Sequence, residues 1–277
     1  MLVDFVKMEG AGNDFIAIDG RSSPLPASDY GGFIARCSDR KRGIGSDGML
    51  VLLPAAQKGF DFVMRFFNPD GSEAEMCGNG ARCIALFAYK AGASREKMRF
   101  NTAAGPVEAE ITPSGVKLKM PPAPAIQDIR SLEAAGQKLD VFFTTAGVPH
   151  AVTPVEDIEN TDVKKLGSAI RHHERFRPAG TNANFIVREA ANAIKLRTYE
   201  RGVEDETLAC GTGATASALA ASRLYGMGSP VSVLTRGGDT LVIHFRRLPD
   251  GSYDDIYLEG PAKEVFSGTV EWPPQGA

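Results

Sequence analysis

The sequence predicts an α+β protein of two duplicated domains, each with several strands and one helix that follows a Cys-Gly-x-Gly turn. The phrase E-x-x-x-C-G-x-G-A occurs twice, at 73–81 (EAEMCGNGA) and at 206–214 (ETLACGTGA), and an alanine-rich run follows both copies. A phrase that recurs only twice and far apart indicates a duplicated domain rather than a solenoid. Hairpins mixed with central helices favour α+β over a parallel α/β sheet.

Strand-like runs dominate both halves of the chain, and turn residues separate them. In the first half they are 5–8, 15–19, 49–54, 60–67 and 97–102, then a hairpin of 106–112 and 116–120 around Pro113-Ser114-Gly115. In the second half they are 141–147, 183–189, 193–200, 231–236 and 240–247.

Two helices are expected at 79–90 and 212–225, each directly after a Cys-Gly-x-Gly turn. Both are rich in Ala and Leu, and Gly92 and Gly226 lie just beyond them, where a left-handed cap is favoured. Further helices are expected at 162–173 and at 29–40.

The proline-rich stretch 120–126 (MPPAPAI) is typical of a linker. We therefore expect an N-terminal domain at 1–121 and a C-terminal domain at 122–263, each with several strands and one helix after a Cys-Gly-x-Gly turn.

Composition excludes several classes of protein. The 277 residues carry a net charge of −3 without a basic run, which argues against a nucleic-acid partner. No apolar segment is long enough to span a membrane, and the first residues lack the pattern of a signal peptide. A cytoplasmic protein without a membrane partner is expected.

The four cysteines do not form a disulfide framework in a chain of this length. No CxxC pair is present, so we expect no metal site. Cys37 and Cys83 are interpreted as small buried apolar side chains.

Cys77 and Cys210 each precede a helix, where unpaired backbone N–H groups and the helix dipole favour a thiolate and can bind a carboxylate. If the two turns face one cleft, one thiol can lie on each face of an α-carbon. That arrangement suits two-base racemisation or epimerisation, in which one thiolate removes a proton and the other thiol delivers one. It requires oriented donors that stabilise the carbanion.

The sequence resembles the diaminopimelate epimerases, which use no cofactor, over nearly its whole length. The resemblance rests on 7–19 (KMEGAGNDFIAID), 42–48, 66–83 (FFNPDGSEAEMCGNGARC), 147–152, 181–185 and 199–214 (YERGVEDETLACGTGA). It implies two pseudosymmetric domains, each with a mixed or antiparallel sheet wrapped around a central helix. It also implies a return segment, 264–277, that packs on the first domain. It also implies a homodimer and epimerisation of LL- to meso-diaminopimelate, a step of lysine and peptidoglycan precursor synthesis.

By the same resemblance, the catalytic residues are Cys77 and Cys210, with His150 and Glu200 supporting the thiols. The substrate-binding residues are Asn13, Asn68, Gly78, Asn79, Asn182, Glu200, Arg201, Gly211 and Thr212. From the residues alone other interpretations stay open, because Asn13 and Asn68 lie in turn-like contexts, Glu200-Arg201 could be an exposed ion pair, and His150 could satisfy a buried backbone group.

Three positions depart from the pattern. Gly48 stands where the family often has Gln, Val148 where it often has Asn, and Phe266 where some members have an interface Tyr. The first two changes remove possible hydrogen bonds to substrate.

Three alternatives follow. The nearest is a proline or hydroxyproline racemase, or another amino acid racemase or related isomerase of the same fold, although the proline racemases more often have His in the CGNG turn. A redox sensor that joins Cys77 to Cys210 is the second. A pyridoxal phosphate enzyme is the third, and it is disfavoured because no Lys has a convincing Schiff-base context.

Overall fold

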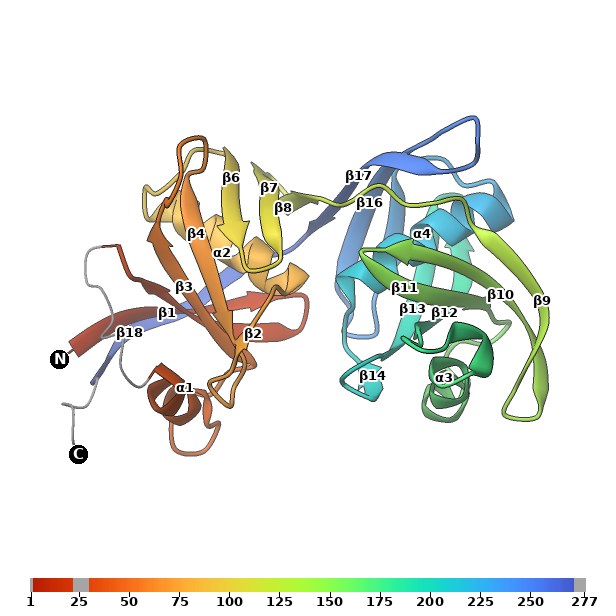
Figure 1. The fold of residues 1–277 in the computed structure, drawn as a ribbon, viewed down its shortest axis with the longest axis horizontal. Helices are drawn as coiled ribbons and strands as arrows, with labels where there is room; N and C mark the ends of the chain where they lie inside the picture. Colours follow the sequence, from red (N-terminus) through yellow and green to blue (C-terminus); the bar gives the residue numbers. More distant parts are fainter. Residues whose placement is uncertain (1, 22–29, 272–277) are drawn as a thin grey trace. The chain divides into compact units, whose positions relative to one another are not determined.

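The computed structural model describes residues 2–21 and 30–271. The chain divides into two compact units, one of Met1–Leu118 with Gly260–Ala277 and the other of Lys119–Glu259. Figure 1 shows both units in the colours of the sequence.

The first unit is a mixed sheet with one helix against it and a second helix at its side. Its elements are β1 (Leu2–Gly10), β2 (Asn13–Asp19), α1 (Tyr30–Ser38), β3 (Gly48–Pro54), β4 (Phe62–Phe67), β5 (Glu73–Ala74), α2 (Gly78–Lys90), β6 (Lys97–Thr102), β7 (Gly105–Thr112), β8 (Gly115–Lys119) and, from the far end of the chain, β18 (Lys263–Glu271). Strand β18 lies antiparallel beside β1 (Figure 1). The parallel pairs are β2–β3 and β4–β6.

The second unit repeats this plan. Its elements are β9 (Gln127–Ala134), β10 (Gln137–Ala146), β11 (Val148–Pro154), α3 (Val163–Arg171), a 3-10 turn (Glu174–Phe176), β12 (Asn182–Ala190), β13 (Ala193–Glu200), β14 (Asp205–Thr207), α4 (Gly211–Tyr225), β15 (Val231–Leu234), β16 (Thr240–Arg247) and β17 (Tyr253–Gly260). The parallel pairs are β11–β12 and β13–β15.

The pairings show the duplication directly. From β1 to β8 the pairs run antiparallel, parallel, antiparallel, antiparallel, parallel, antiparallel and antiparallel, and β10 to β17 give the same series. Strand β18 on β1 corresponds to β9 on β10. The expected α+β fold with two pseudosymmetric halves is confirmed.

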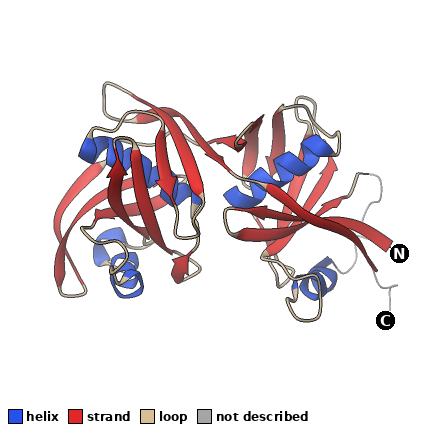
Figure 2. Cartoon of the chain, turned by 180° about the vertical axis from the view of Figure 1, so that it is seen from behind, coloured by secondary structure: helices blue, strands red, loops and turns tan. Residues whose placement is uncertain are grey.

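Helices α2 and α4 pack against several strands of their own units (Figure 2). Small residues make this close packing possible: Ala81, Ala85 and Ala88 of α2 are fully buried among strand side chains. Helix α4 is buried continuously from its third residue to Ser222. A helix that is buried on all sides needs a surrounding shell of strands, and the sheet supplies it.

The expected helices agree with the structure to within two residues, and residue 29 of the fourth lies outside the described residues. Gly226 has the left-handed conformation expected of the cap, with φ 69°. Strands β5, β9, β11, β14, β17 and β18 were not predicted. Strand β9 is largely polar and exposed, and nearly every residue of β18 is exposed, so neither shows a buried alternation.

Candidate functional site

The two thiols that the sequence singled out occupy equivalent places in the fold. Cys77 is the N-cap of α2 and Cys210 is the N-cap of α4, and both have extended backbone angles (φ −132°, ψ 125° and φ −124°, ψ 112°). Each helix therefore begins immediately after its thiol. The first N–H groups of a helix have no intrahelical acceptor, and they point toward the N-cap side.

The Cys210 thiol lies in a defined polar setting. The backbone N–H of Gly213 donates to Cys210 Sγ at 3.3 Å, and Thr212 Oγ1 lies 3.5 Å from the same sulfur. The Glu200 carboxyl also hydrogen-bonds with Cys210 and accepts from Thr207 Oγ1 at 3.0 Å. Burial raises the pKa of Glu200, and these two hydrogen bonds oppose that rise in part.

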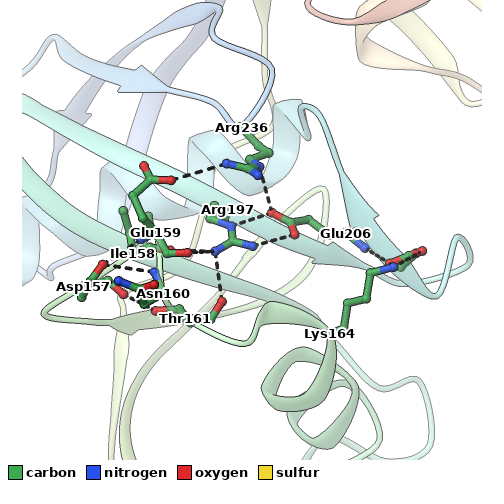
Figure 3. Close-up of polar contacts among 10 residues, drawn as sticks. Asp157, Ile158, Glu159, Asn160, Thr161, Lys164, Arg197, Glu206 and Arg236 are labelled. Carbon is green, nitrogen blue, oxygen red and sulfur yellow. Dashed lines mark hydrogen bonds and ion pairs between the residues drawn. The ribbon is translucent and has the colours of Figure 1, made fainter.

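The β13–β14 hairpin that carries Glu200 and Thr207 is braced by a charged cluster (Figure 3). Arg197 forms a two-point ion pair with Glu206, at 2.6 and 2.8 Å, and the same guanidinium donates to the carbonyl groups of Ile158 and Thr161. Such paired donors fix a side chain in one geometry. The cluster therefore holds the loop after β11 to the hairpin.

Asn182 and Arg201 are joined beside this hairpin. The backbone N–H of Arg201 donates to Asn182 Oδ1 at 2.8 Å, and Asn182 Nδ2 donates to the carbonyl of Pro149 at 3.0 Å. Asn182 pairs in register with His150 across β11 and β12. The Arg201 guanidinium is thereby placed at the turn after β13, where it donates to Ala179 O.

His150 is fully buried, and burial together with the charge of Arg201 lowers its pKa to about 3. Asn184 Nδ2 lies 3.2 Å from His150 Nδ1 and donates to Ala151 O at 3.1 Å. Among the described residues, no hydrogen-bond partner lies within reach of His150 Nε2. A buried donor or acceptor without a partner costs about 1–3 kcal/mol, so its retention needs a reason.

In the first unit, Asn13 and Asn79 form a directed hydrogen-bond chain. Arg82 Nη2 donates to Asn79 Oδ1 (2.8 Å), Asn79 Nδ2 donates to Asn13 Oδ1 (2.7 Å), and Asn13 Nδ2 donates to Asp47 Oδ2 (3.0 Å). A guanidinium only donates and a carboxylate only accepts, so the two ends of the chain fix the orientation of both amides. Neither Arg82 nor Asp47 is among the site residues predicted from the sequence.

Asp47 belongs to a wider charged group. Arg40 bridges Asp47 (2.7 Å) and Asp14 (2.5 Å), and Lys7 lies 2.6 Å from Asp14. Burial raises the pKa of Asp14, but hydrogen bonds from Arg40 and Lys7 outweigh that effect and bring it to about 2. Asp14 is therefore charged at neutral pH.

Asn68 makes different contacts. Its Nδ2 donates to Ser72 Oγ at 3.1 Å inside the turn that follows β4, and its backbone N–H donates to Ser72 O. Gly48 packs tightly, since a Cβ there would lie 2.5 Å from Phe67 O and 2.7 Å from the Phe66 ring. A side chain at position 48 would therefore require the backbone of Phe67 to move.

Cys37 and Cys83 are buried, which confirms their interpretation. Burial raises the pKa of Cys37 to about 11 and raises that of Cys83 further. Neither is suited to form a thiolate. In the described part of the chain, no three His, Cys, Asp or Glu side chains gather as a metal site would require. None of the described helices has the length and apolar character of a membrane span.

Each unit thus gathers its own part of the expected set. The first holds Asn13, Cys77, Gly78 and Asn79 around the start of α2, with Asn68 in its separate turn. The second holds His150, Asn182, Glu200, Arg201, Cys210, Gly211 and Thr212 around the start of α4.

Comparison with known proteins gives consistent results. The family model described as "Diaminopimelate epimerase" matches residues 5–125 and 142–263. A diaminopimelate epimerase of Aquifex aeolicus is 43% identical over 277 residues, covering 97% of this chain and 98% of the relative. One of Chlorobaculum tepidum is 42% identical and covers 95% of this chain and 99% of the relative.

Solved structures of lower identity share the fold. A Bacillus anthracis phenazine biosynthesis protein of the PhzF family superposes with a TM-score of 0.72 at 13% identity, over 98% of this chain and all of that one. A probable proline racemase of Agrobacterium radiobacter gives 0.67 at 17% identity, over 99% of this chain and 94% of that one.

Proposed function

Since the chain belongs to the diaminopimelate epimerase family, we propose that it interconverts LL- and meso-diaminopimelate by two-base proton transfer at one α-carbon. The likeness to a proline racemase, at 17% identity, extends to the fold alone.

One observation carries the proposal. Both copies of the duplicated unit keep a cysteine as the N-cap of the central helix, Cys77 before α2 and Cys210 before α4. A duplicated fold that presents two such thiols supplies the two groups that inversion at a carbon requires.

In the proposed reaction, one thiolate takes the proton from the α-carbon and the other thiol gives a proton to the opposite face. The electron pair of the broken C–H bond stays on the substrate, delocalised into the α-carboxylate, until the second proton arrives. Glu200 supports the Cys210 thiol in this proposal, because its carboxyl hydrogen-bonds with that thiol.

The α-carboxylate is assigned to the helix starts. Backbone N–H groups at Gly78-Asn79 and at Gly211-Thr212 lie where a helix favours negative charge. Oriented donors of this kind stabilise the carbanion as it forms. Asn13, Asn68, Asn182 and Arg201 bind the remaining amino and carboxylate groups in this proposal, with the guanidinium suited to the distal carboxylate.

The proposed reaction needs no cofactor, because the two thiols supply both the acid and the base. It places the protein in lysine and peptidoglycan precursor synthesis, with a cytoplasmic location. We further propose a homodimer formed through β18, where Val265 and Phe266 are about half exposed (58% and 49%).

The test is α-hydrogen exchange. The reduced protein is incubated in D₂O with LL-diaminopimelate and, separately, with D- and L-proline, and deuterium uptake and configuration are followed. We expect uptake and inversion for diaminopimelate only, and at least a roughly 100-fold loss of inversion in both Cys77→Ala and Cys210→Ala, as expected for removal of an acid or base.

Exchange into proline alone would move the protein to the racemases. Absence of exchange into every amino acid would overturn the acid–base function, and a redox role of the two thiols would then be tested by activity or binding in the oxidised state.

A further inference from the structure

We propose that His150 serves the reaction as a neutral hydrogen-bond donor through Nε2, and that Asn184 is the positioning residue that fixes this tautomer. The inference rests on the proposed function, and it assigns a role to a residue that the sequence analysis did not name.

The orientation of the Asn184 amide follows from its neighbours. Its Nδ2 lies 3.1 Å from the carbonyl of Ala151, which can only accept, and its Oδ1 accepts from Thr198 Oγ1 at 3.0 Å. The second hydrogen on Nδ2 then points to His150 Nδ1, 3.2 Å away. That ring nitrogen must be the acceptor, so the proton of a neutral ring lies on Nε2.

All three side chains of this group, His150, Asn184 and Thr198, are buried, with at most 2% exposed. The Nε2–H is therefore a desolvated donor that finds no acceptor among the described residues. Buried polar groups are normally satisfied, and a donor held in one direction without a partner is what a site for an anionic ligand requires.

The duplicated unit provides an internal comparison. Strands β2 and β11 have the same length and the same burial pattern, and each pairs in parallel with the next long strand, β3 or β12. By strand register, His150 corresponds to Phe15 and Asn184 to Leu50. Thr198 corresponds to Phe66 through the following strand pair.

The contacts with the central helix agree with this correspondence. A Cβ on Gly80 of α2 would meet Leu50 Cδ2 at 3.1 Å, and a Cβ on Gly213 of α4 would meet Asn184 Oδ1 at 2.6 Å. The first unit thus fills the same three places with Phe15, Leu50 and Phe66, all buried. The fold does not need polar groups there, so the polar set of the second unit serves the chemistry.

The location of the set supports the same role. The Cβ position of Gly213 that touches Asn184 Oδ1 also lies 3.2 Å from Cys210 Sγ, so the amide packs against the thiol turn. Among the described residues, Arg201 is the charged group that acts on the imidazole, and it disfavours a second proton on the ring. With Nδ1 engaged by Asn184 and Nε2 already protonated, the ring cannot take a proton from a thiol or from substrate.

The first experiment reads the tautomer in the wild-type protein. The reduced full chain is labelled with ¹⁵N-histidine, and long-range ¹H–¹⁵N spectra are recorded at neutral pH, where the His150 signals are those that vanish in His150→Ala. We expect Nε2 protonated and Nδ1 unprotonated. A ring protonated on Nδ1, alone or on both nitrogens, would overturn the proposal, and this reading does not depend on which substrate is turned over.

The second experiment separates a donor from a base. Gln at position 150 can accept from Asn184 through its oxygen and donate through its amide, but it cannot take a proton. We expect His150→Gln to keep α-deuterium exchange within about 10-fold of wild type, and His150→Ala to lose about 100-fold, as when one preorganised donor is removed. Equal losses in the two variants would make His150 a base.

The third experiment tests Asn184 with the residue that the first unit uses. In Asn184→Leu we expect a mixture of His150 tautomers and at least a roughly 10-fold lower exchange rate. We also expect a lower thermal stability, because Ala151 O and Thr198 Oγ1 lose the hydrogen bonds that Asn184 makes with them. Thr198→Val is the matched control, because Ala151 O still orients the amide, so the tautomer should persist. An unchanged tautomer in Asn184→Leu would remove the positioning role. If the wild-type protein shows no α-deuterium exchange into diaminopimelate, the proposed function is wrong, whatever the tautomer of His150.

Discussion

At the scale of single residues, Glu200 shows how the site and the stability of the fold oppose each other. Its carboxyl is mostly buried. It hydrogen-bonds with Thr207 and Cys210 but forms no ion pair among the described residues. Burial raises its pKa above the ordinary value of about 4.5, so the folded protein holds this proton more tightly than the unfolded chain does.

Glu200→Gln should therefore lose activity and gain stability. As the pH rises from about 4.5, the unfolded chain loses the proton first, so the folded state becomes less stable until its own carboxyl has ionised. We expect the Gln variant to be more stable than wild type at pH 8, with no such gain at pH 4. Its α-hydrogen exchange should fall at least about 100-fold.

Urea unfolding at the two pH values measures the difference, and Glu204→Gln provides an exposed control in the same hairpin. Two results would contradict this account of Glu200: a Gln variant that is less stable than wild type at pH 8, or one that gains the same stability at pH 4 as at pH 8.

Residues of the site differ in how far the sequence reveals them. Cys77 and Cys210 could be predicted from the repeated phrase alone, because the phrase carries both the thiol and the helix start. Asn184 could not, since an Asn within an apolar strand shows its partners only once β11 and β12 are paired in register. Arg82, inside α2, likewise acts through a contact that only the folded chain creates.

At the scale of elements, the starts of α2 and α4 are equivalent in sequence but differ in how well they accommodate a side chain at the second glycine of the turn, Gly80 or Gly213. A Cβ on Gly80 would meet the flexible end of Leu50, whereas a Cβ on Gly213 would meet the hydrogen-bonded Asn184 carbonyl, closer than real atoms approach. We expect Gly213→Ala to destabilise the protein by about 1–3 kcal/mol, the usual cost of overpacking a core.

Gly80→Ala is the matched control. The small adjustment of Leu50 is offset by a gain in helix propensity of about 1 kcal/mol, so stability should change little. Equilibrium unfolding in urea gives both values. Equal changes in the free energy of unfolding would contradict this prediction, because they would show that the Asn184 carbonyl moves away from the new Cβ as easily as a leucine methyl group does.

The strands show where sequence patterns suffice and where they do not. Strands β13 and β16 coincide with their expected ranges. Along each of them, buried residues alternate with less buried ones, which is the pattern that predicts a strand. Strand β11, which carries His150, was missed because it contains Pro149 and ends at Pro154, and Pro weakens a strand prediction. Its parallel partner β12 holds it in the sheet.

At the scale of the whole molecule, the proposed homodimer is tested at β18. Phe266 packs edge-on against Phe5 of β1, with ring centroids 5.9 Å apart, and is still half exposed. Aromatic side chains at the centre of an interface commonly contribute about 2 kcal/mol or more, so Phe266→Asp should raise the dimer dissociation constant at least about 30-fold.

Sedimentation velocity over a range of concentrations measures the change, and Ser114→Asp in the exposed β7–β8 turn is the control. A dimer that is unaffected by Phe266→Asp would place the interface elsewhere, and a wild-type protein that stays monomeric would remove it.

The pairing of β18 with β1 also bears on how the chain is synthesised. In the second unit the strand beside β10 is β9, which comes first in that unit, whereas in the first unit the corresponding strand comes last in the chain. The first unit is in effect a circular permutant of the second. On a ribosome it waits roughly 8–30 s, at about 5–20 residues per second, for residues 263–271 to emerge and cover the edge of β1. Through that interval the nascent first unit has an unpaired edge at β1, which can pair with another chain, whereas the second unit is synthesised as one continuous segment.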